Sequence, residues 1–216
     1  SGHDLSGMDL SGADLREATL IGADLTGANL TGARLGNIDL SGANLANTIL
    51  ADADLTDAVL TGAYVDGSDF SGATLAGTTL TGLLNTTATP TTFANATLSG
   101  ATLNGNLVGA NLSGANLAGT DVSTATLTGA NFTRAKLSTA IGLAAADATG
   151  ADFTEADLAG VDVSGFSSPI TCPDGTTSSS HSSQDCVGHL LANSFAGLEQ
   201  SIQAPISANA TAIDAE

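Results

Sequence analysis

The residues best able to do chemistry lie near the C-terminus, where two cysteines and two histidines share one short segment. Cys172 and Cys186 are fourteen residues apart and are flanked by Pro, Gly and Ser. In a chain with two cysteines this arrangement favours a disulfide bond, which is typical of oxidising compartments. A zinc site made by Cys172, His181, Cys186 and His189 is an alternative, although paired zinc ligands are usually two to four residues apart. Free thiols are the third possibility.

The rest of the sequence shows no pattern typical of an active site. It lacks G-x-S-x-G, H-E-x-x-H and a glycine-rich phosphate loop. The third histidine, His3, lies near the first residue, and Ser and Asp are abundant because a repeat supplies them. We therefore expect a protein that is not an enzyme and that uses no cofactor or catalytic metal.

Charge and composition exclude further classes of function. The chain has 216 residues, with 22 acidic and 4 basic side chains, so its formal net charge is −18. A protein that binds nucleic acid directly needs a basic stripe, and one that stacks bases needs aromatic side chains. This chain lacks the basic stripe, since it has four basic side chains, and it is poor in stacking aromatic residues, since it has no Trp and one Tyr. No apolar run approaches the roughly 18 residues of a membrane span, and we see no signal peptide.

Most of the chain consists of a five-residue repeat, which determines where its side chains lie. Leu, or rarely Val or Phe, occurs at every fifth position from Leu5 to Leu80, which gives sixteen consecutive matches. In most repeats a small residue, usually Ala, lies two places before it, and in fifteen of the sixteen Gly, Asn or Asp lies two places after it. Because Gly, Asn and Asp tolerate positive φ, this period predicts a short extended segment followed by a tight turn. The inward side chains are then Leu and Ala.

The triplets Ala13-Asp14-Leu15, Ala28-Asn29-Leu30 and Ala156-Asp157-Leu158 are typical instances of this repeat. The sequence resembles the pentapeptide-repeat family, whose consensus is A-(D/N)-L-x-x, over roughly residues 3–165. This resemblance implies an all-β fold, a right-handed quadrilateral parallel β-helix of about eight coils. The two-cysteine segment also resembles the tail of exported family members. Together with the predicted disulfide, this suggests an extracytoplasmic location: secreted, periplasmic or lumenal.

The spacing of the repeats divides the chain into two domains. We expect a β-helix over residues 1–166, with a loop and a break in phase near 83–92, and a cysteine-containing tail over 167–216. Leu191, Phe195, Leu198 and Ile202 follow helical spacing. They predict a helical cap over about 189–203. The other end has no such cap, so a homodimer could form through that end or through the C-terminal helix.

Residues twenty apart should stack into columns along such a rod. We expect one core ladder of Leu5, Leu25, Leu45 and Val65, and a second of Leu15, Leu35, Leu55 and Leu75. On the surface, Asp14, Arg34 and Asp54 should form an ion-pair ladder, with Asn116, Lys136 and Asp157 as its later counterpart.

Three functions are compatible with this pattern. The first is a rigid structural or protein-interaction rod with an unknown protein partner. The second follows from the resemblance, since family members that protect DNA gyrase from quinolones are thought to imitate DNA. The third is ice binding through Thr19, Thr61, Thr79 and Thr81, although Asp39 interrupts that face.

Overall fold

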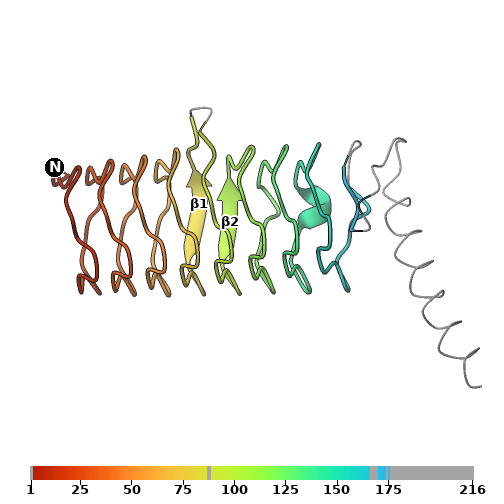
Figure 1. Ribbon diagram of the computed structural model, residues 1–216, viewed down its shortest axis with the longest axis horizontal. Helices are drawn as coiled ribbons and strands as arrows, with labels where there is room; N and C mark the ends of the chain where they lie inside the picture. The colour runs from red at the N-terminus through yellow and green to blue at the C-terminus, as the bar shows by residue number, and fades with distance from the viewer. Residues whose placement is uncertain (1, 87–88, 166–169, 174, 176–216) are drawn as a thin grey trace, which may run out of the picture.

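The chain folds into a rod of stacked coils (Figure 1). This computed structural model describes residues 2–86, 89–165, 170–173 and 175. Two short parallel strands pair with each other, β1 (Thr79–Leu83) and β2 (Thr102–Gly105), and one 3₁₀ turn, η1, spans Leu143–Ala145. Elsewhere, single residues of successive coils form parallel bridges. The right-handed quadrilateral β-helix that the resemblance implies is confirmed. The predicted helical cap at 189–203 lies outside the described residues.

Each coil contributes one outward residue to each of four columns, which define four faces. The columns are as follows: face 1, Asp4, Asp24, Asn44, Tyr64 and Leu84, continued by Asn106, Thr126 and Asp147; face 2, Asp9, Asn29, Ile49, Asp69, Thr92, Asn111, Asn131, Asp152 and Thr171; face 3, Asp14, Arg34, Asp54, Thr74, Thr97, Asn116, Lys136 and Asp157; face 4, Thr19, Asp39, Val59, Thr79, Thr102, Asp121 and Ile141. Faces 1 and 3 are opposite sides of the quadrilateral.

Backbone hydrogen bonds between coils follow from the same repeat. The amide of Leu5 donates to the carbonyl of Asp24 at 2.7 Å, and the amide of Asp24 donates to the carbonyl of His3 at 2.8 Å. Corners use the left-handed backbone region, which Gly62 occupies at φ 68 and Asp52 at φ 57. Gly, Asn and Asp therefore recur at the corners because they adopt that conformation at least cost.

The core consists of columns of aliphatic side chains with alanines beside them. In the two expected core ladders, six members are completely buried: Leu25, Leu45, Val65, Leu35, Leu55 and Leu75. Leu5 and Leu15 are only partly buried, because their coil is packed against another on one side only. The inward column behind face 1 continues beyond Val65 to Asn85, which is polar, and then to Leu107.

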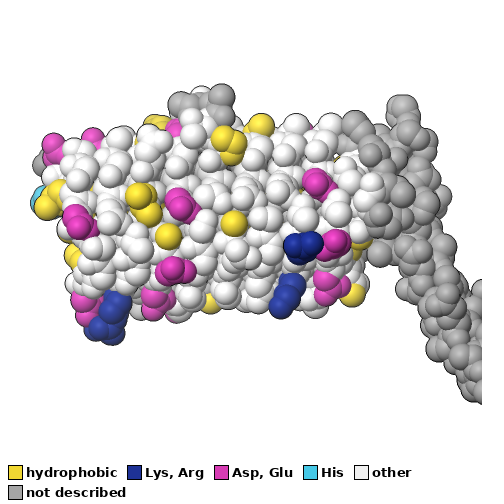
Figure 2. Space-filling model, viewed as in Figure 1, with side chains coloured by type: hydrophobic (Ala, Val, Ile, Leu, Met, Phe, Trp, Pro, Cys, Tyr) yellow, Lys and Arg dark blue, Asp and Glu magenta, His cyan; other side chains and the backbone are white. Residues whose placement is uncertain are grey.

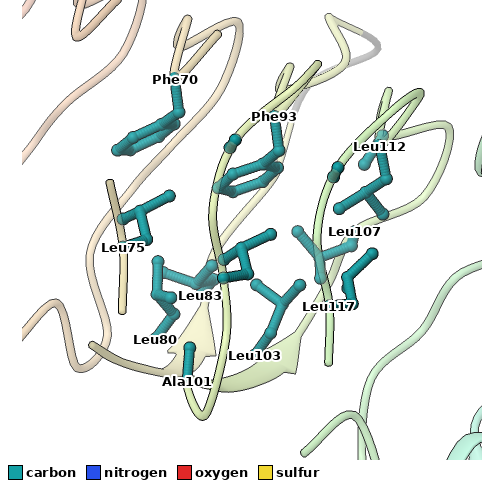
Figure 3. Close-up of a cluster of buried hydrophobic side chains, with 14 of the residues drawn as sticks. Phe70, Leu75, Leu80, Leu83, Phe93, Ala101, Leu103, Leu107, Leu112 and Leu117 are labelled. Carbon is teal, nitrogen blue, oxygen red and sulfur yellow. The ribbon is translucent and has the colours of Figure 1, made fainter. Parts of the chain in front are cut away.

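Two aromatic pairs fill the core behind face 2. The rings of Phe70 and Phe93 stack with centroids 5.0 Å apart and 9° between their planes, as Figure 3 shows. Phe132 and Phe153 stack in the same way at 4.9 Å. In the coil of β1, the buried Leu83 stands where the two preceding coils have Ala43 and Ala63 and the following coil has Gly105. The larger side chain fills the core at the point where the repeat changes phase.

The phase break begins later than the sequence indicates. Leu83 is still part of β1, and Leu84 still bridges Tyr64. The ladder resumes at Thr92, so the projecting loop follows Leu84 (Figure 1). The residue lost before Leu107 corresponds to an irregularity in register opposite Gly105. The residue gained before Leu143 corresponds to Gly142, with φ 76, and η1.

The solenoid extends past the boundary expected at residue 166. Thr171 pairs with Asp152, and the amide of Glu155 donates to the carbonyl of Pro173 at 2.7 Å. Ile170 and Cys172 are both buried, in the places that Ala151 and Phe153 occupy one coil earlier. The segment 170–173 is therefore a further rung of face 2. The sequence did not reveal it, because it lacks the Ala-Asp-Leu signature.

Candidate functional site

The interior of the rod is occupied by packed side chains. Its few buried hydroxyls are bonded to the backbone: Thr48 Oγ1 donates to the carbonyl of Leu25 at 2.7 Å, and Thr120 Oγ1 donates to that of Leu98 at 2.7 Å. Within the described part of the chain, no three His, Cys, Asp or Glu side chains are grouped so that they could hold a metal ion. That same part contains no helix of the length and apolarity required to cross a bilayer. Functional chemistry must therefore be sought on the outer faces.

The cysteine site is only partly visible. Cys172 is buried at the end of the face 2 core column. Cys186 lies outside the described residues, as do His181 and His189. The Cys172–Cys186 disulfide and the zinc alternative both stay predictions.

Carboxylates on the faces are held by short local hydrogen bonds. Asp39 accepts from the amide of Ser41 at 2.9 Å and from its hydroxyl at 2.6 Å. Asp54 has the same arrangement with Thr56, at 3.0 and 2.6 Å. The hydroxyl bond, followed by the amide bond, lowers the pKa of both carboxyl groups. These carboxylates therefore remain charged into the acid range.

The predicted ion-pair ladder is formed in part. Asp14 Oδ2 lies 3.2 Å from Arg34 Nη1, but it also bonds Arg16, whose Nη2 is 2.7 Å away. The pKa of Asp14 falls to about 2, chiefly through the hydrogen bond from Arg16. Asp54 follows Arg34 in the column and forms no ion pair with it among the described contacts. Sequence reasoning missed Arg16, because it considered only residues twenty apart.

The later counterpart of that ladder differs in the same way. Asn116, Lys136 and Asp157 are successive rungs of face 3. In the described coils Lys136 makes no ion pair, whereas its neighbour Arg134 bonds Glu155 at the corner between faces 2 and 3. That bond is the main cause that lowers the pKa of Glu155.

All four Lys and Arg side chains of the chain gather on one side. Arg34 and Lys136 lie on face 3, Arg16 lies at the corner between faces 3 and 4, and Arg134 lies at the corner between faces 2 and 3. In the view of Figure 2, the dark blue Lys and Arg atoms lie on the lower part of the rod. The other three faces carry carboxylates without a cation of their own: Asp4, Asp24, Asp66 and Asp147 on face 1, Asp9, Asp69 and Asp152 on face 2, and Asp39 and Asp121 on face 4.

Face 4 carries the threonines considered for ice binding. Its column places Asp39 and Val59 between Thr19 and Thr79, and Asp121 after Thr102. Thr61 and Thr81 lie in the adjacent outward positions. Carboxylates thus divide the threonines, so this face lacks the continuous flat array on which that hypothesis depends.

Two polar features beside the loop were not anticipated. Asp66 is buried and accepts from the amide of Thr86 at 2.6 Å and from its hydroxyl at 3.1 Å. Asn85 is buried as well, and its Oδ1 atom has no hydrogen-bond partner among the residues that the structure describes. No sequence signal marks either residue, because each depends on where the loop begins.

Comparison with known proteins gives family and fold. The pentapeptide repeats pattern matches in eight copies over residues 4–37, 38–77, 106–141 and 143–166. No curated protein sequence matches significantly.

Among solved structures, HetL, a pentapeptide repeat protein involved in heterocyst differentiation regulation from the cyanobacterium Nostoc sp. strain PCC 7120, is 32% identical. The match covers 81% of this chain and 78% of HetL, with a TM-score of 0.44. A trypsin-treated form of QnrB1, a plasmid-mediated fluoroquinolone resistance protein, is 23% identical over 76% of this chain and 89% of that one, with a TM-score of 0.48. Rfr23, from the cyanobacterium Cyanothece 51142, is 27% identical over 56% and 86%, with a TM-score of 0.34. By the extent of the repeat match, which covers more than half of its residues, this chain belongs to the pentapeptide repeat family.

Proposed function

We propose that this chain is a non-enzymatic rod that acts through its outer faces, as a structural or protein-interaction element with a protein partner. The observation that carries this proposal is the division between inside and outside. Inward positions are filled mainly by apolar side chains and bonded hydroxyls, while outward positions form four mostly polar columns whose successive rungs are about 4.8 Å apart. Such columns offer an extended, rigid surface, which suits contact with another protein better than binding of a small substrate.

Affinity capture with defined variants tests this proposal. The purified chain is immobilised and incubated with an extract of its source organism, and a retained protein is then purified and titrated by calorimetry. Three variants neutralise carboxylates on one face each: Asp24→Asn on face 1, Asp152→Asn on face 2 and Asp121→Asn on face 4. We expect binding to weaken for one face and circular dichroism to stay unchanged. The proposal is contradicted if no protein is retained, or if the retained protein shows no affinity in the titration.

A second candidate is an acidic mimic of DNA that binds DNA gyrase. It is supported by the net charge of −18 and by three faces that carry carboxylates without cations. The cations on face 3 would confine such a contact to the remaining faces. The purified chain should then inhibit gyrase supercoiling or protect it from a quinolone, and addition of salt should weaken this effect. Supercoiling that is unchanged at micromolar concentrations of the chain would reject this candidate.

The location of the protein bears on the choice between the two. The predicted disulfide favours an extracytoplasmic location, where gyrase is absent. Alkylation of the native protein before and after reduction, read by mass spectrometry, decides whether Cys172 and Cys186 are oxidised. Two alkylated cysteines without reduction would favour a cytoplasmic protein and the gyrase candidate.

A further inference from the structure

An apolar patch interrupts the polar surface of face 1 beside the loop. Tyr64 and Leu84 are consecutive rungs of its column and remain 42% and 36% exposed. Val108, 46% exposed, lies at the edge of the same face one coil further. We call these three residues the face 1 patch. Figure 2 shows hydrophobic side chains close to the base of the projecting loop.

The fold itself does not require apolar side chains at these positions. The same column holds Asp24 and Asn44 before Tyr64, and Asn106 and Thr126 after Leu84. These polar residues form equivalent bridges and face solvent. An exposed aromatic ring next to an exposed leucine leaves apolar surface in water that a polar residue at either place would not. The face 1 patch is therefore better explained by contact with something outside the chain.

A depression lies next to the patch on its N-terminal side. It has a volume of about 390 Å³ and is floored by small residues, among them Gly22, Gly42 and Ala46. Tyr64, Asp66 and Thr86 also line it. The hydrogen bonds from Thr86 hold the Asp66 carboxylate in place. A side chain from a partner could enter this depression and pack against the Tyr64 ring.

The charges around the patch are of one sign. Asp24 lines the depression, and Asp147 lies further along the same column. Every Lys and Arg of the chain lies on or beside face 3, on the opposite side of the rod. A partner that covers the patch therefore meets carboxylates without competing cations, which selects for Lys or Arg beside its apolar group.

Building on the function proposed above, we infer that face 1 docks a protein segment that carries an aliphatic or aromatic side chain flanked by Lys or Arg. The apolar side chain packs on Tyr64, Leu84 and Val108. The basic side chains approach Asp24 and the carboxylates along the column. Aromatic anchors at the centre of a contact with charges at the rim are the usual arrangement of energetically important residues in interfaces.

Selection from a phage library of short randomised peptides on the immobilised full chain tests this inference. The disruptive variant is Tyr64→Thr, Leu84→Thr and Val108→Thr combined, since Thr126 and Thr128 occupy the same two outward positions one coil later. Ile141→Thr on face 4 is the matched control, because Ile141 is 57% exposed. Asp24→Asn and Asp157→Asn form a second matched pair, on faces 1 and 3.

We expect selected peptides to be rich in Lys and Arg around an apolar residue. Their affinity should fall at least tenfold for the triple variant and threefold for Asp24→Asn, with no change for Ile141→Thr or Asp157→Asn. Selected peptides that bind the triple variant as well as the parent overturn the docking site, as does the absence of the basic and apolar class. Either result leaves the broader proposal intact if the affinity capture yields a partner that binds another face.

Discussion

The two halves of the rod achieve the same ladder by different means. In the N-terminal block, residues 3–82, the column of face 2 advances by twenty residues each time, from Asp9 through Asn29 and Ile49 to Asp69. In the C-terminal block, residues 91–165, the same column is reached after intervals of 23, 19, 20 and 21 residues, at Thr92, Asn111, Asn131 and Asp152. No rung of face 2 is missing in either block.

The difference shows that the number of residues in a coil is less constrained than the pairing between coils. Extra residues leave the coil as a loop after Leu84 or as the η1 turn, and a missing residue is absorbed beside Gly105. All these changes lie on or next to faces 1 and 4, so the columns of faces 2 and 3 stay straight. Irregular spacing therefore needs particular residues at a few places, and those places should be unusually sensitive to substitution.

Gly105→Ala should cause the largest loss of stability. Gly105 has φ 140, and an added Cβ would lie 2.5 Å from the Leu83 amide nitrogen and 2.8 Å from its carbonyl oxygen. Backbone atoms of the neighbouring coil cannot move without opening the β1–β2 pairing, so we expect a loss of about 4 kcal/mol or failure to fold. Urea unfolding followed by circular dichroism measures it. A loss no larger than that of Gly62→Ala, in the N-terminal block, would refute the special role of this position.

Gly→Ala substitutions at corners that face an Asp or Asn side chain should cause the next largest loss of stability, in both blocks. A Cβ at Gly72 would lie 2.3 Å from Asp52 Oδ1, and one at Gly114 would lie 2.3 Å from Asn95 Oδ1. Gly62 and Gly129 have similar φ and open space around the added atom. We expect Ala at the open positions to cost about 1–2 kcal/mol through positive φ alone, and Ala at the crowded ones to cost more.

The urea midpoints of these four variants give the comparison. If the crowded and the open glycine of a block lose the same stability on substitution, the Asp and Asn side chains move aside freely. A larger loss in only one block would mean that the two blocks do not share the same corner packing.

Asn85→Leu should stabilise the junction between the blocks. The unpartnered Oδ1 of Asn85 is buried at a place where the neighbouring coils have Val65 and Leu107. Removing an unsatisfied polar atom and filling the column should gain about 1–2 kcal/mol. Asn104→Leu is the control, because Asn104 Oδ1 accepts the amide of Thr124 at 3.0 Å. That substitution should destabilise, and a gain from both would show that hydrogen bonding does not decide the outcome.

The sequence predicts the repetitive part of this molecule well, and for a physical reason. Each Leu, Ala and corner Gly reports directly on burial or backbone conformation, so the extended segment and the tight turn follow from spacing, whereas the four-sided coil follows from the resemblance to the family. Features that do not follow the five-residue pattern were not predicted. Arg16 reaches Asp14 within one turn, and the rung around Cys172 pairs despite its atypical residues. The face 1 patch was overlooked because outward positions were judged by charge, and the position of Asn85 became clear only once the start of the loop was known.

The smallest effects concern the ion pairs, one in each block. The pKa of Asp14 in the folded chain is about 2, below the value of 3.8 for an unperturbed carboxyl group, and the pKa of Glu155 is also lowered. A lowered folded pKa stabilises above the unfolded pKa, and this contribution disappears as the pH falls through the folded value. Asp14→Asn and Glu155→Gln should therefore lower the urea midpoint slightly at pH 6. Both differences should shrink as the pH approaches 2 and vanish below it, and differences that persist below pH 2 would contradict the ionic origin.

Distances between spin labels test most directly whether one unbroken ladder runs through both blocks. Nitroxides are attached on face 2 at Asp9 and Asn111, and separately at Ile49 and Asp152, with the native cysteines substituted. Each pair spans five rungs of the column, so both distances should centre near 24 Å at about 4.8 Å per rung. A distance clearly longer than 24 Å for either pair, or a broad distribution, would mean that the ladder is interrupted where the spacing is irregular.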